Sequence, residues 1–496
     1  MARGKHRRLK VRSVKFNVIM NMVITTSAYL FPLITIPYAS RVLLTSGMGH
    51  IAFAQSVASY FALFAQLGIT YYGVNSCAEV RDNPRELSRR AKELMVLLFW
   101  STSIVTAFYI AAIVFIPQMR DQYPLFLVYA TTLWLSTFGL DWLYQALEQY
   151  EYIAVRNMVF KLIAIALMFL LVKQQKDYVV YGAIVVFASY GSNIMNLLRL
   201  RTFIDFSYHG KLNVHQHLKP MFWFTVAVIA SGMYVQVDLI LLGFISTNHA
   251  VGLYQLASKI KSFLIGAVNA VGSVMLPRLS YYEATNNAKK TRSLMTKDFN
   301  FMFDMGFGIV ALLIIDAIPI VQLMGGPAFL DSAKPLRFIG PAILFSAINM
   351  NLGSYIITKK RIKKLAIANV IGLAFATACN FVLIPRLGIV GSALSISLCE
   401  FLMLIIRGAL AGDLIKSIWK KSNPLRVIVS AAVAAVATSL IDVHLGLSNF
   451  FIRLIGIAVI FGVLYLALLL LVRESFLRSM VQQCADKLHH RASTSE

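Results

Sequence analysis

Apolar stretches of about 18–25 residues recur along the chain and are separated by short polar segments. Each is long enough for an α-helix to cross a hydrocarbon core of about 30 Å. The pattern therefore predicts an all-α polytopic membrane protein with about fourteen transmembrane helices. The expected spans are 17–38, 51–75, 94–116, 125–148, 156–172, 179–198, 221–245, 251–276, 299–323, 335–358, 365–384, 391–412, 425–441 and 450–472.

Composition agrees with that pattern. Of the 496 residues, 58% are hydrophobic and 14% are charged, whereas a soluble domain is roughly 45–50% apolar and about 25% charged. The segments between the spans are too short to hold a soluble domain. The four cysteines lack the spacing of a metal site and are interpreted as free thiols. The basic start "MARGKHRRLKVRSVK" precedes a span without a small-residue cleavage site, which predicts a retained first helix.

The net charge of +25 is distributed unevenly along the chain. One side of the membrane carries 36 of the 47 lysines and arginines, counted over the amino terminus, 76–93, 149–156, 199–220, 277–298, 359–364, 407–426 and the carboxyl tail. Basic loops remain cytoplasmic, so both termini are predicted to be cytoplasmic, as an even number of spans requires. The charge is therefore interpreted as a topology signal rather than as a nucleic-acid surface.

The chain also contains a weak internal repeat. "HIAFAQSVAS" (50–59) resembles "AVGLYQLASK" (250–259), "IAVRN" (153–157) resembles "LAIAN" (365–369), and "YGAI" (181–184) resembles "VGSA" (390–393). The similar offsets predict two six-helix bundles in the same orientation around a central cavity, as in one transporter architecture. The expected organisation is a bundle over 1–200, a cytoplasmic linker over 201–220, a second bundle over 221–415, two appended helices over 416–472 and a cytoplasmic tail over 473–496.

Several longer segments carry a family resemblance. They are "IPYASRVLLTSGMGHIAFAQSVASYFALFAQLGITYYGVNSCAEVRDNPRELS" (36–88), "GLDWLYQALEQYEYIAVRNMVFKLIAIALMFLLVKQQKDYVVYGAI" (139–184), "VMLPRLS" (274–280) and "CNFVLIPRLGIVGSALSISLCEF" (379–401). The sequence resembles Wzx-type polysaccharide flippases of the multidrug/oligosaccharidyl-lipid/polysaccharide superfamily. The resemblance implies alternating access in a bacterial cytoplasmic membrane and an undecaprenyl-diphosphate-linked oligosaccharide as cargo. It also implies a downstream polymerase and other glycan-assembly proteins as partners.

Basic residues inside the expected spans are the candidates for binding the diphosphate and sugars of such a cargo. Lys259 and Lys261 lie near mid-depth, and they point about 200° apart, so only one of them is expected to face the substrate. Lys161 lies in the inner part of its span, while Arg41 and Arg337 lie at the outer surface. Lys161, Arg41 and Arg337 could instead extend their charges to the headgroups.

Acidic residues inside the spans are the candidates for coupling ions or for lining the cavity. Asp141, Gln145 and Glu148 share one face if span 125–148 is a continuous helix, and this face could line the inner mouth of the cavity or form ion pairs. Asp238 could pair with Lys259 or Lys261.

Glu400 is a further candidate acid. No cofactor is predicted, and the possible coupling ion is H⁺ or Na⁺. Pro32 and Pro37 could bend the first span as a hinge or form a simple kink.

Two other functions were weighed against the flippase. An ion-coupled drug or organic-cation antiporter would favour an acidic cavity, and the deep lysines argue against it. A membrane polysaccharide polymerase would need a large exposed active-site loop. The sequence contains no glycine-rich phosphate loop, no zinc-ligand cluster and no other catalytic motif, so a transporter is predicted rather than an enzyme.

Overall fold

The computed structural model describes residues 13–206, 212–285, 287–359, 361–412, 414–415, 418, 424–445 and 450–472. The predicted tail 473–496, the basic segment 1–12 and part of the predicted linker 201–220 lie outside these ranges. Regular secondary structure in the described residues is entirely helical. The helices are α1 (Val14–Gln66), α2 (Ile69–Ala78), α3 (Pro84–Phe115), α4 (Pro117–Arg120), α5 (Tyr123–Gly139), α6 (Asp141–Ala146), α7 (Tyr150–Leu171), η1 (Gln175–Asp177), α8 (Tyr178–Val186), η2 (Phe187–Gly191), α9 (Asn193–Arg199), η3 (Leu200–Thr202), α10 (His215–Ile245), α11 (Asn248–Ala284), α12 (Ala288–Gly325), η4 (Pro327–Ser332), α13 (Ala333–Thr358), α14 (Ile362–Leu387), α15 (Ile389–Ala411), α17 (Pro424–Leu445) and α18 (Phe450–Leu471).

Twelve helical segments of the described residues are long and apolar enough to cross a membrane. The all-α polytopic fold is therefore confirmed, but the predicted count of fourteen is not. One candidate runs over Ile19–Ala78 and takes in two predicted spans. At 1.5 Å per residue these 60 residues would measure about 90 Å, three times the thickness of the hydrocarbon core. Predicted span 251–276 lies in α11, which is not among the twelve.

The long first helix is not continuous. Within α1 the backbone leaves helical geometry at Leu44, where φ is 57° and ψ is −174°. Two predicted spans, 17–38 and 51–75, lie on either side of this residue. The break therefore divides a segment that is too long for one crossing into two helical parts.

Contacts along the chain divide it into two compact units. Unit 1 contains residues 1–255, 324–328 and 369–389, and unit 2 contains 256–323, 329–368 and 390–496. Helices α11 and α14 contribute residues to both units. The predicted boundaries of the two bundles, 1–200 and 221–415, stay a prediction.

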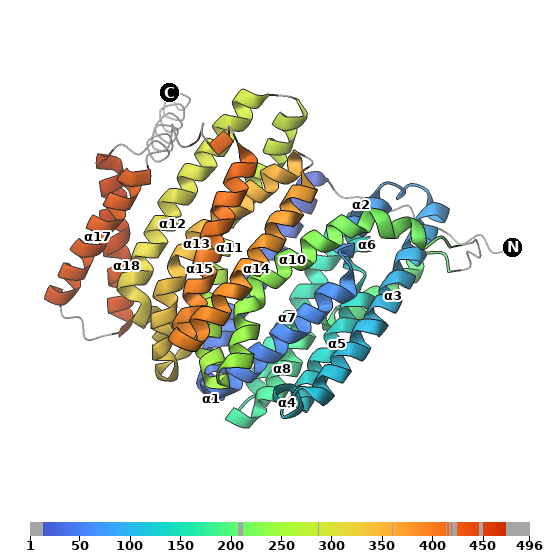
Figure 1. Ribbon diagram of the computed structural model, residues 1–496, viewed down its shortest axis with the longest axis horizontal. Helices are drawn as coiled ribbons and strands as arrows, with labels where there is room; N and C mark the ends of the chain where they lie inside the picture. The colour runs from blue at the N-terminus through green and yellow to red at the C-terminus, as the bar shows by residue number, and fades with distance from the viewer. Residues whose placement is uncertain are drawn as a thin grey trace, which may run out of the picture. The chain divides into compact units, whose positions relative to one another are not determined.

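In unit 1, α1 is the central element, because it contacts α3, α5, α7, α8 and α10 (Figure 1). Close approach of α1 to α10 depends on glycine. A Cβ atom on Gly232 would lie 2.7 Å from the Leu63 side chain, and one on Gly243 would lie 2.2 Å from the Phe53 ring. Small residues let helix backbones pack closely inside a membrane.

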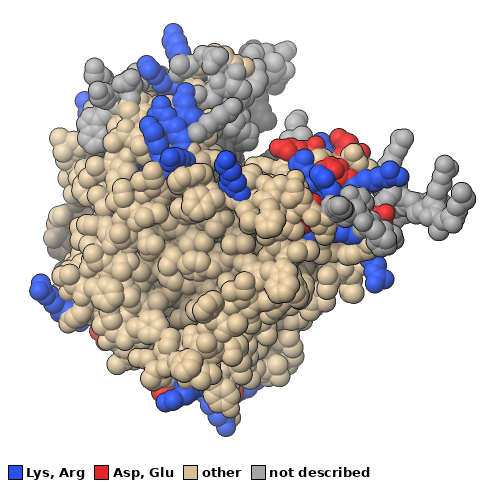
Figure 2. All heavy atoms as spheres, turned by 45° about the vertical axis from the view of Figure 1, so that its right-hand side comes forward, with Lys and Arg blue, Asp and Glu red and all other residues tan. Residues whose placement is uncertain are grey.

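Charged side chains lie toward the ends of the helices. On the face shown in Figure 2, lysine and arginine gather at these ends and the surface between them is uncharged. Helix α3 shows how one such end is built. It begins at Pro84, directly after Asn83, whose side chain accepts a hydrogen bond from the backbone nitrogen of Glu86 at 3.3 Å.

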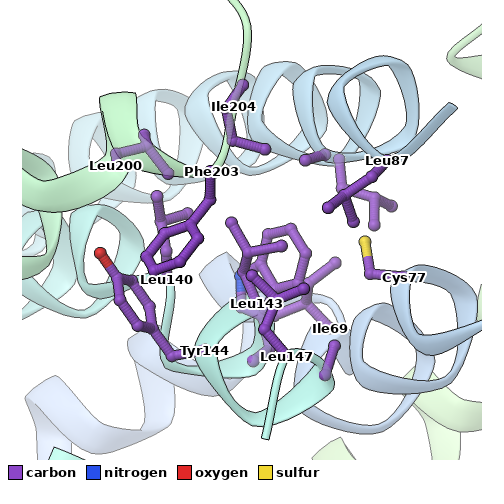
Figure 3. Packing of buried hydrophobic residues seen from close by; sticks show 14 of the residues in the cluster. Ile69, Cys77, Leu87, Leu140, Leu143, Tyr144, Leu147, Leu200, Phe203 and Ile204 are labelled. Atoms are coloured by element: carbon purple, nitrogen blue, oxygen red, sulfur yellow. The ribbon is translucent and has the colours of Figure 1, made fainter. Parts of the chain in front are cut away.

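A cluster of buried apolar side chains fills one end of unit 1. Figure 3 shows Ile69 and Cys77 from α2 packed beside Leu143 and Leu147, together with Leu87 from α3. Cys77, Cys379 and Cys399 are free thiols, as predicted, while Cys484 lies outside the described residues. The cluster holds α2 and α6 together directly after the points where the preceding helices break.

Unit 2 has two apolar clusters. One joins α11, α12, α13 and α15, and the other joins α12 to the paired helices α17 and α18. The second cluster includes a polar contact, because the Tyr465 hydroxyl of α18 donates to the backbone oxygen of Asp304 at 2.7 Å. The two appended helices are thus packed on α12.

Candidate functional site

The segment predicted as a continuous span over 125–148 is broken in the structure. Helix α5 ends at Gly139, Leu140 has a left-handed backbone with φ of 49°, and α6 begins at Asp141. Glu148 lies beyond the end of α6 and also has a left-handed φ of 54°. The prediction that Asp141, Gln145 and Glu148 share a face of one helix is therefore wrong, because only Asp141 and Gln145 belong to α6.

Side chains from α9 donate hydrogen bonds to backbone oxygens of α5 beside this break. Asn193 donates to the oxygen of Leu135 at 3.0 Å, and Asn196 donates to the oxygen of Gly139. A Cβ atom at Gly139 would lie 2.3 Å from the amide nitrogen of Asn193, so the contact needs glycine at that position. Unpaired backbone groups cost several kcal/mol inside a membrane, which explains two asparagines in an apolar span.

Asp141 and Arg156 form an ion pair at the same break. An Nη2 group of Arg156 lies 2.7 Å from Oδ1 of Asp141, and Asn196 donates to that oxygen at 2.8 Å. The Arg156 side chain is 2% exposed and also donates to the backbone oxygen of Ser192 at 2.9 Å, whereas the Asp141 side chain is 38% exposed. The structure contains an ion pair, which is one of the two roles predicted for Asp141. The other role, lining of a cavity, stays a prediction.

Glu148 is bound on the other side of α6. Its carboxylate accepts a hydrogen bond from Arg81, in the turn after α2, and from Asn17 of α1 at 3.0 Å. The Glu148 carboxylate raises the pKa of the Arg81 guanidinium above its usual value. This acid therefore joins three segments of unit 1.

Asp238 and Glu400 are buried and hydrogen-bonded. In unit 1, the Tyr254 hydroxyl donates to Asp238. In unit 2, Asn349 donates to a carboxylate oxygen of Glu400 at 2.7 Å, and Arg407 donates to the backbone oxygen of Asn349 at 2.7 Å. The predicted pairing of Asp238 with Lys259 or Lys261 stays a prediction.

The three lysines inside the helices have a different environment from these acids. Lys161 of α7 donates to the Ser27 hydroxyl of α1 at 2.9 Å. Lys261 of α11 is 6% exposed, and Lys259 is partly buried. Among the described residues of its own unit, none of the three has a carboxylate partner. Each therefore places a basic group inside a helix without a carboxylate partner in its own unit.

The remaining predicted residues lie near helix ends or within α1. Arg41 is exposed and donates to the backbone oxygen of Pro37 at 2.6 Å. Arg337 is exposed near the start of α13. The backbone of α1 stays helical at Pro32 and Pro37 and leaves helical geometry at Leu44 instead. The hinge role of the two prolines stays a prediction.

A buried cluster in unit 1 was not predicted from the sequence. Glu93 of α3 accepts hydrogen bonds from the backbone nitrogen of Asn213 and the side chain of Gln216, both at 2.7 Å. Its carboxylate also lies 2.8 Å from Nε2 of His217, whose Nδ1 lies 2.8 Å from the Tyr72 hydroxyl. Glu93 gave little signal in the sequence because it stands just before an expected span, where acids are common.

Residues 14–283 match the family profile described as polysaccharide biosynthesis protein. This match covers more than half of the chain. The chain belongs to the polysaccharide biosynthesis protein family. A relative described as a candidate O-antigen transporter, from Escherichia coli (strain K12), is 24% identical over 365 residues, which are 71% of this chain and 85% of the relative. The predictions of this family and of a transporter rather than an enzyme are therefore confirmed.

Solved structures of the same fold agree with this assignment. The chain resembles the lipid II flippase MurJ in an inward closed conformation, with a TM-score of 0.72, 15% identity and coverage of 92% of this chain and 99% of that one. It also resembles an inward-facing multidrug resistance MATE family transporter of the MOP superfamily, with a TM-score of 0.61, 13% identity and coverage of 84% and 98%. These likenesses show that this member of the polysaccharide biosynthesis protein family has the MOP fold.

Proposed function

We propose that this protein is a flippase that moves a polyprenyl-diphosphate-linked oligosaccharide across the cytoplasmic membrane by alternating access. The family and the candidate O-antigen transporter among its relatives support this class of cargo. The observation that carries the proposal is the set of lysines inside the helices, Lys161, Lys259 and Lys261, which lack carboxylate partners among the described residues of their own units.

The chemistry of the cargo explains why such lysines are useful. The isoprenoid chain can remain in lipid, but the diphosphate and the sugars must cross a medium in which polar groups are costly. A lysine that is already paired with an acid offers little net charge to a phosphate. A lysine without such a partner offers its full positive charge to a phosphate. Each unit contains at least one lysine of this kind: Lys161 in unit 1, and Lys259 and Lys261 in unit 2.

The acids of the spans also fit this cargo better than an organic cation. Asp141 is paired with Arg156, Glu148 with Arg81, and Glu400 with Asn349. A carrier of organic cations would need a carboxylate available to the cargo. These three acids are therefore engaged by other side chains and give no support to the drug-antiporter alternative.

Native mass spectrometry of the detergent-purified protein tests the proposal. We expect a retained glycolipid whose mass includes a polyprenyl diphosphate, and we expect added undecaprenyl diphosphate to bind. Lys161→Gln and Lys261→Gln should each weaken this binding by about tenfold or more, because a charge-assisted hydrogen bond contributes about 1.5–3 kcal/mol, while Lys161→Arg and Lys261→Arg should retain most of it.

Lys334→Gln is the matched control, because this lysine is exposed and lies 3.8 Å from the carboxylate of Asp331. Equal binding by the wild type and the two glutamine variants, or no binding of undecaprenyl diphosphate at all, would contradict the proposal. A cell-based test is independent of purification. Deletion of the gene should cause lipid-linked repeat units to accumulate on the cytoplasmic leaflet.

A further inference from the structure

Asp316 differs from the other buried acids described above. It lies in α12 and is 1% exposed, and neither of its carboxylate oxygens has a hydrogen-bond partner among the described residues. Asp141, Asp238 and Glu400 all accept hydrogen bonds. An ionised carboxylate buried in this way would be very costly, and such groups become neutral or bind a cation instead.

The backbone around Asp316 is also unusual. Within α12 it is the residue at which the backbone leaves helical geometry, with φ of −118° and ψ of 19°. Pro319 follows in the same helix and has no N–H group to donate to the carbonyl oxygen of Ile315, four residues earlier. A carboxyl group that carries a proton can donate to such an oxygen, whereas a carboxylate can only accept. Interrupted helices supply ion and proton sites in transporters in this manner.

Charged groups on the neighbouring helices limit what Asp316 can bind. Arg453 of α18 and Asp442 of α17 interact electrostatically with it. Arg453 and Asp442 also hold each other through two hydrogen bonds, of 3.1 and 2.7 Å. Other charged residues lie on the elements packed against α12, and within the described part of the chain they exert no comparable effect on Asp316; they are Lys259 and Lys261 of α11, Lys334 and Arg337 of α13, and Glu400 and Arg407 of α15.

This environment favours a proton over a metal cation. No group of three or more His, Cys, Asp or Glu side chains that could hold a metal ion exists among the described residues. Asp316 would be a single acidic ligand, and the nearby guanidinium of Arg453 opposes a second positive charge. A proton removes the charge of the carboxylate itself and needs no further ligand.

We propose that Asp316 is a proton-binding site of unit 2, placed where α12 bends against the α17–α18 pair. The proton associates with one carboxylate oxygen, so the step adds one H⁺ and changes no other bond. Loss of this proton leaves a buried negative charge that α12, α17 and α18 must rearrange to solvate or pair. Proton binding at Asp316 is thereby linked to the shape of α12. That this linkage drives transport rests on the proposed function; the binding itself does not.

Infrared difference titration of the full chain in lipid nanodiscs tests the binding. Wild type and Asp331→Asn should show a protonated-carboxyl stretch that disappears at alkaline pH, and Asp316→Asn should lack it. Asp331 is the matched control because it is an exposed acid of the same unit. Asp316→Glu keeps the titrating group, so this variant should retain a band at a shifted frequency even if Asp316→Asn folds poorly.

The same titration separates proton binding from sodium binding. Replacing choline chloride by sodium chloride should leave the band unchanged. A band of equal intensity in wild type and Asp316→Asn, or a band that sodium removes at constant pH, would overturn the proposal.

Transport assays then address the linkage. In proteoliposomes, a pH gradient should change the rate of translocation of a lipid-linked oligosaccharide by wild type and Asp331→Asn at least several-fold. The same gradient should leave Asp316→Asn unaffected. A titrating band without any translocation by the wild type would contradict the proposed function and leave the proton site supported; equal gradient dependence in wild type and Asp316→Asn would refute the linkage.

Discussion

At the scale of single residues, the structure distinguishes acids that are paired with basic or amide groups from lysines that have no carboxylate partner in their own unit. Arg156 is nearly inaccessible and depends on Asp141 for its counter-charge. Asp141→Ala should therefore destabilise the protein by about 3–5 kcal/mol, because it leaves a buried charge without a partner. Asp331→Ala removes an exposed partner of Lys334 and should cost about 1 kcal/mol or less.

The order of melting temperatures in detergent checks this prediction. Asp141→Ala should melt well below Asp331→Ala, and the double variant Asp141→Ala/Arg156→Met should recover most of the loss, since it removes the isolated charge as well. Equal melting temperatures for the two single variants would show that the pair does not contribute as the geometry indicates.

The unpredicted Glu93 cluster gives a second residue-scale prediction. Glu93→Ala would leave the buried side chain of His217 without its carboxylate partner and would also remove the acceptor of Gln216, so it should lower stability by about 3–5 kcal/mol. Glu86→Ala, seven residues earlier on α3, removes partly exposed pairs with Arg89 and Arg90, and we expect about 1 kcal/mol or less. Thermal unfolding monitored by size-exclusion chromatography would reveal the difference, and similar curves for both variants would refute it.

At the scale of elements, the apolar pattern was sufficient to predict helices and insufficient to predict where they break. Leu44, Leu67 and Leu140 all have positive φ, yet leucine is a good helix former and gives no local signal. A left-handed residue costs about 1–2 kcal/mol. The compensating contacts come from distant segments. Thr225 donates to the backbone oxygen of Leu67 at 2.7 Å, and Asn193 and Asn196 donate to backbone oxygens beside the break at Leu140.

For the candidate site, too, the sequence identified the residues better than it identified the helices that carry them. The sequence identified Lys161, Lys259 and Lys261 because a charge in an apolar span is conspicuous. It also offered an ion pair as one role of Asp141, and the structure contains that pair, with Arg156 as the partner. The prediction that Glu148 lies on the same helix face as Asp141 is wrong, because it depended on an unbroken helix over 125–148. Patterns of period 3.6 carry no information about such interruptions.

A close crossing of two elements in unit 1 supports a third prediction. A Cβ atom on Gly49 of α1 would lie 1.8 Å from the backbone oxygen of Asn248, and one on Gly252 of α11 would lie 1.9 Å from that of Thr45. The Thr45 hydroxyl also lies 2.6 Å from Nδ1 of His249. Because backbone atoms form both obstacles, no side-chain movement can make room.

Gly49→Ala and Gly252→Ala should each therefore lower stability by about 1–3 kcal/mol or more, through separation of the two helices. Gly462→Ala is the control, since nothing lies within 4 Å of a Cβ atom there and alanine is the better helix former. Melting temperatures at or above the wild-type value for all three variants would show that the crossing tolerates a larger separation.

At the scale of the whole molecule, each unit contains a buried asparagine that donates a hydrogen bond to a carboxylate on another helix. In unit 2, Asn349 of α13 binds Glu400 of α15; in unit 1, Asp141 binds Asn196 of α9. The two asparagines are 153 residues apart, so their contacts are not related by the sequence repeat. The two-bundle organisation remains a prediction.

The orientation in the membrane follows from the charge distribution and can be measured directly. If basic loops are cytoplasmic, the turn after α2 faces the cytoplasm and the segment between α7 and α8 faces outside. Both contain exposed positions, Asp82 and Lys176. In a variant whose four cysteines are replaced by serine, Lys176→Cys should react with a membrane-impermeant maleimide in intact spheroplasts.

Asp82→Cys should react with the same maleimide only in inverted vesicles, because its loop would be on the opposite face. The parent without cysteine should not react in either preparation. Labelling of Asp82→Cys in intact spheroplasts would reverse the proposed orientation of unit 1. Labelling of both positions from the same side would instead require an even number of crossings between α2 and α8, whereas the expected spans 94–116, 125–148 and 156–172 require three.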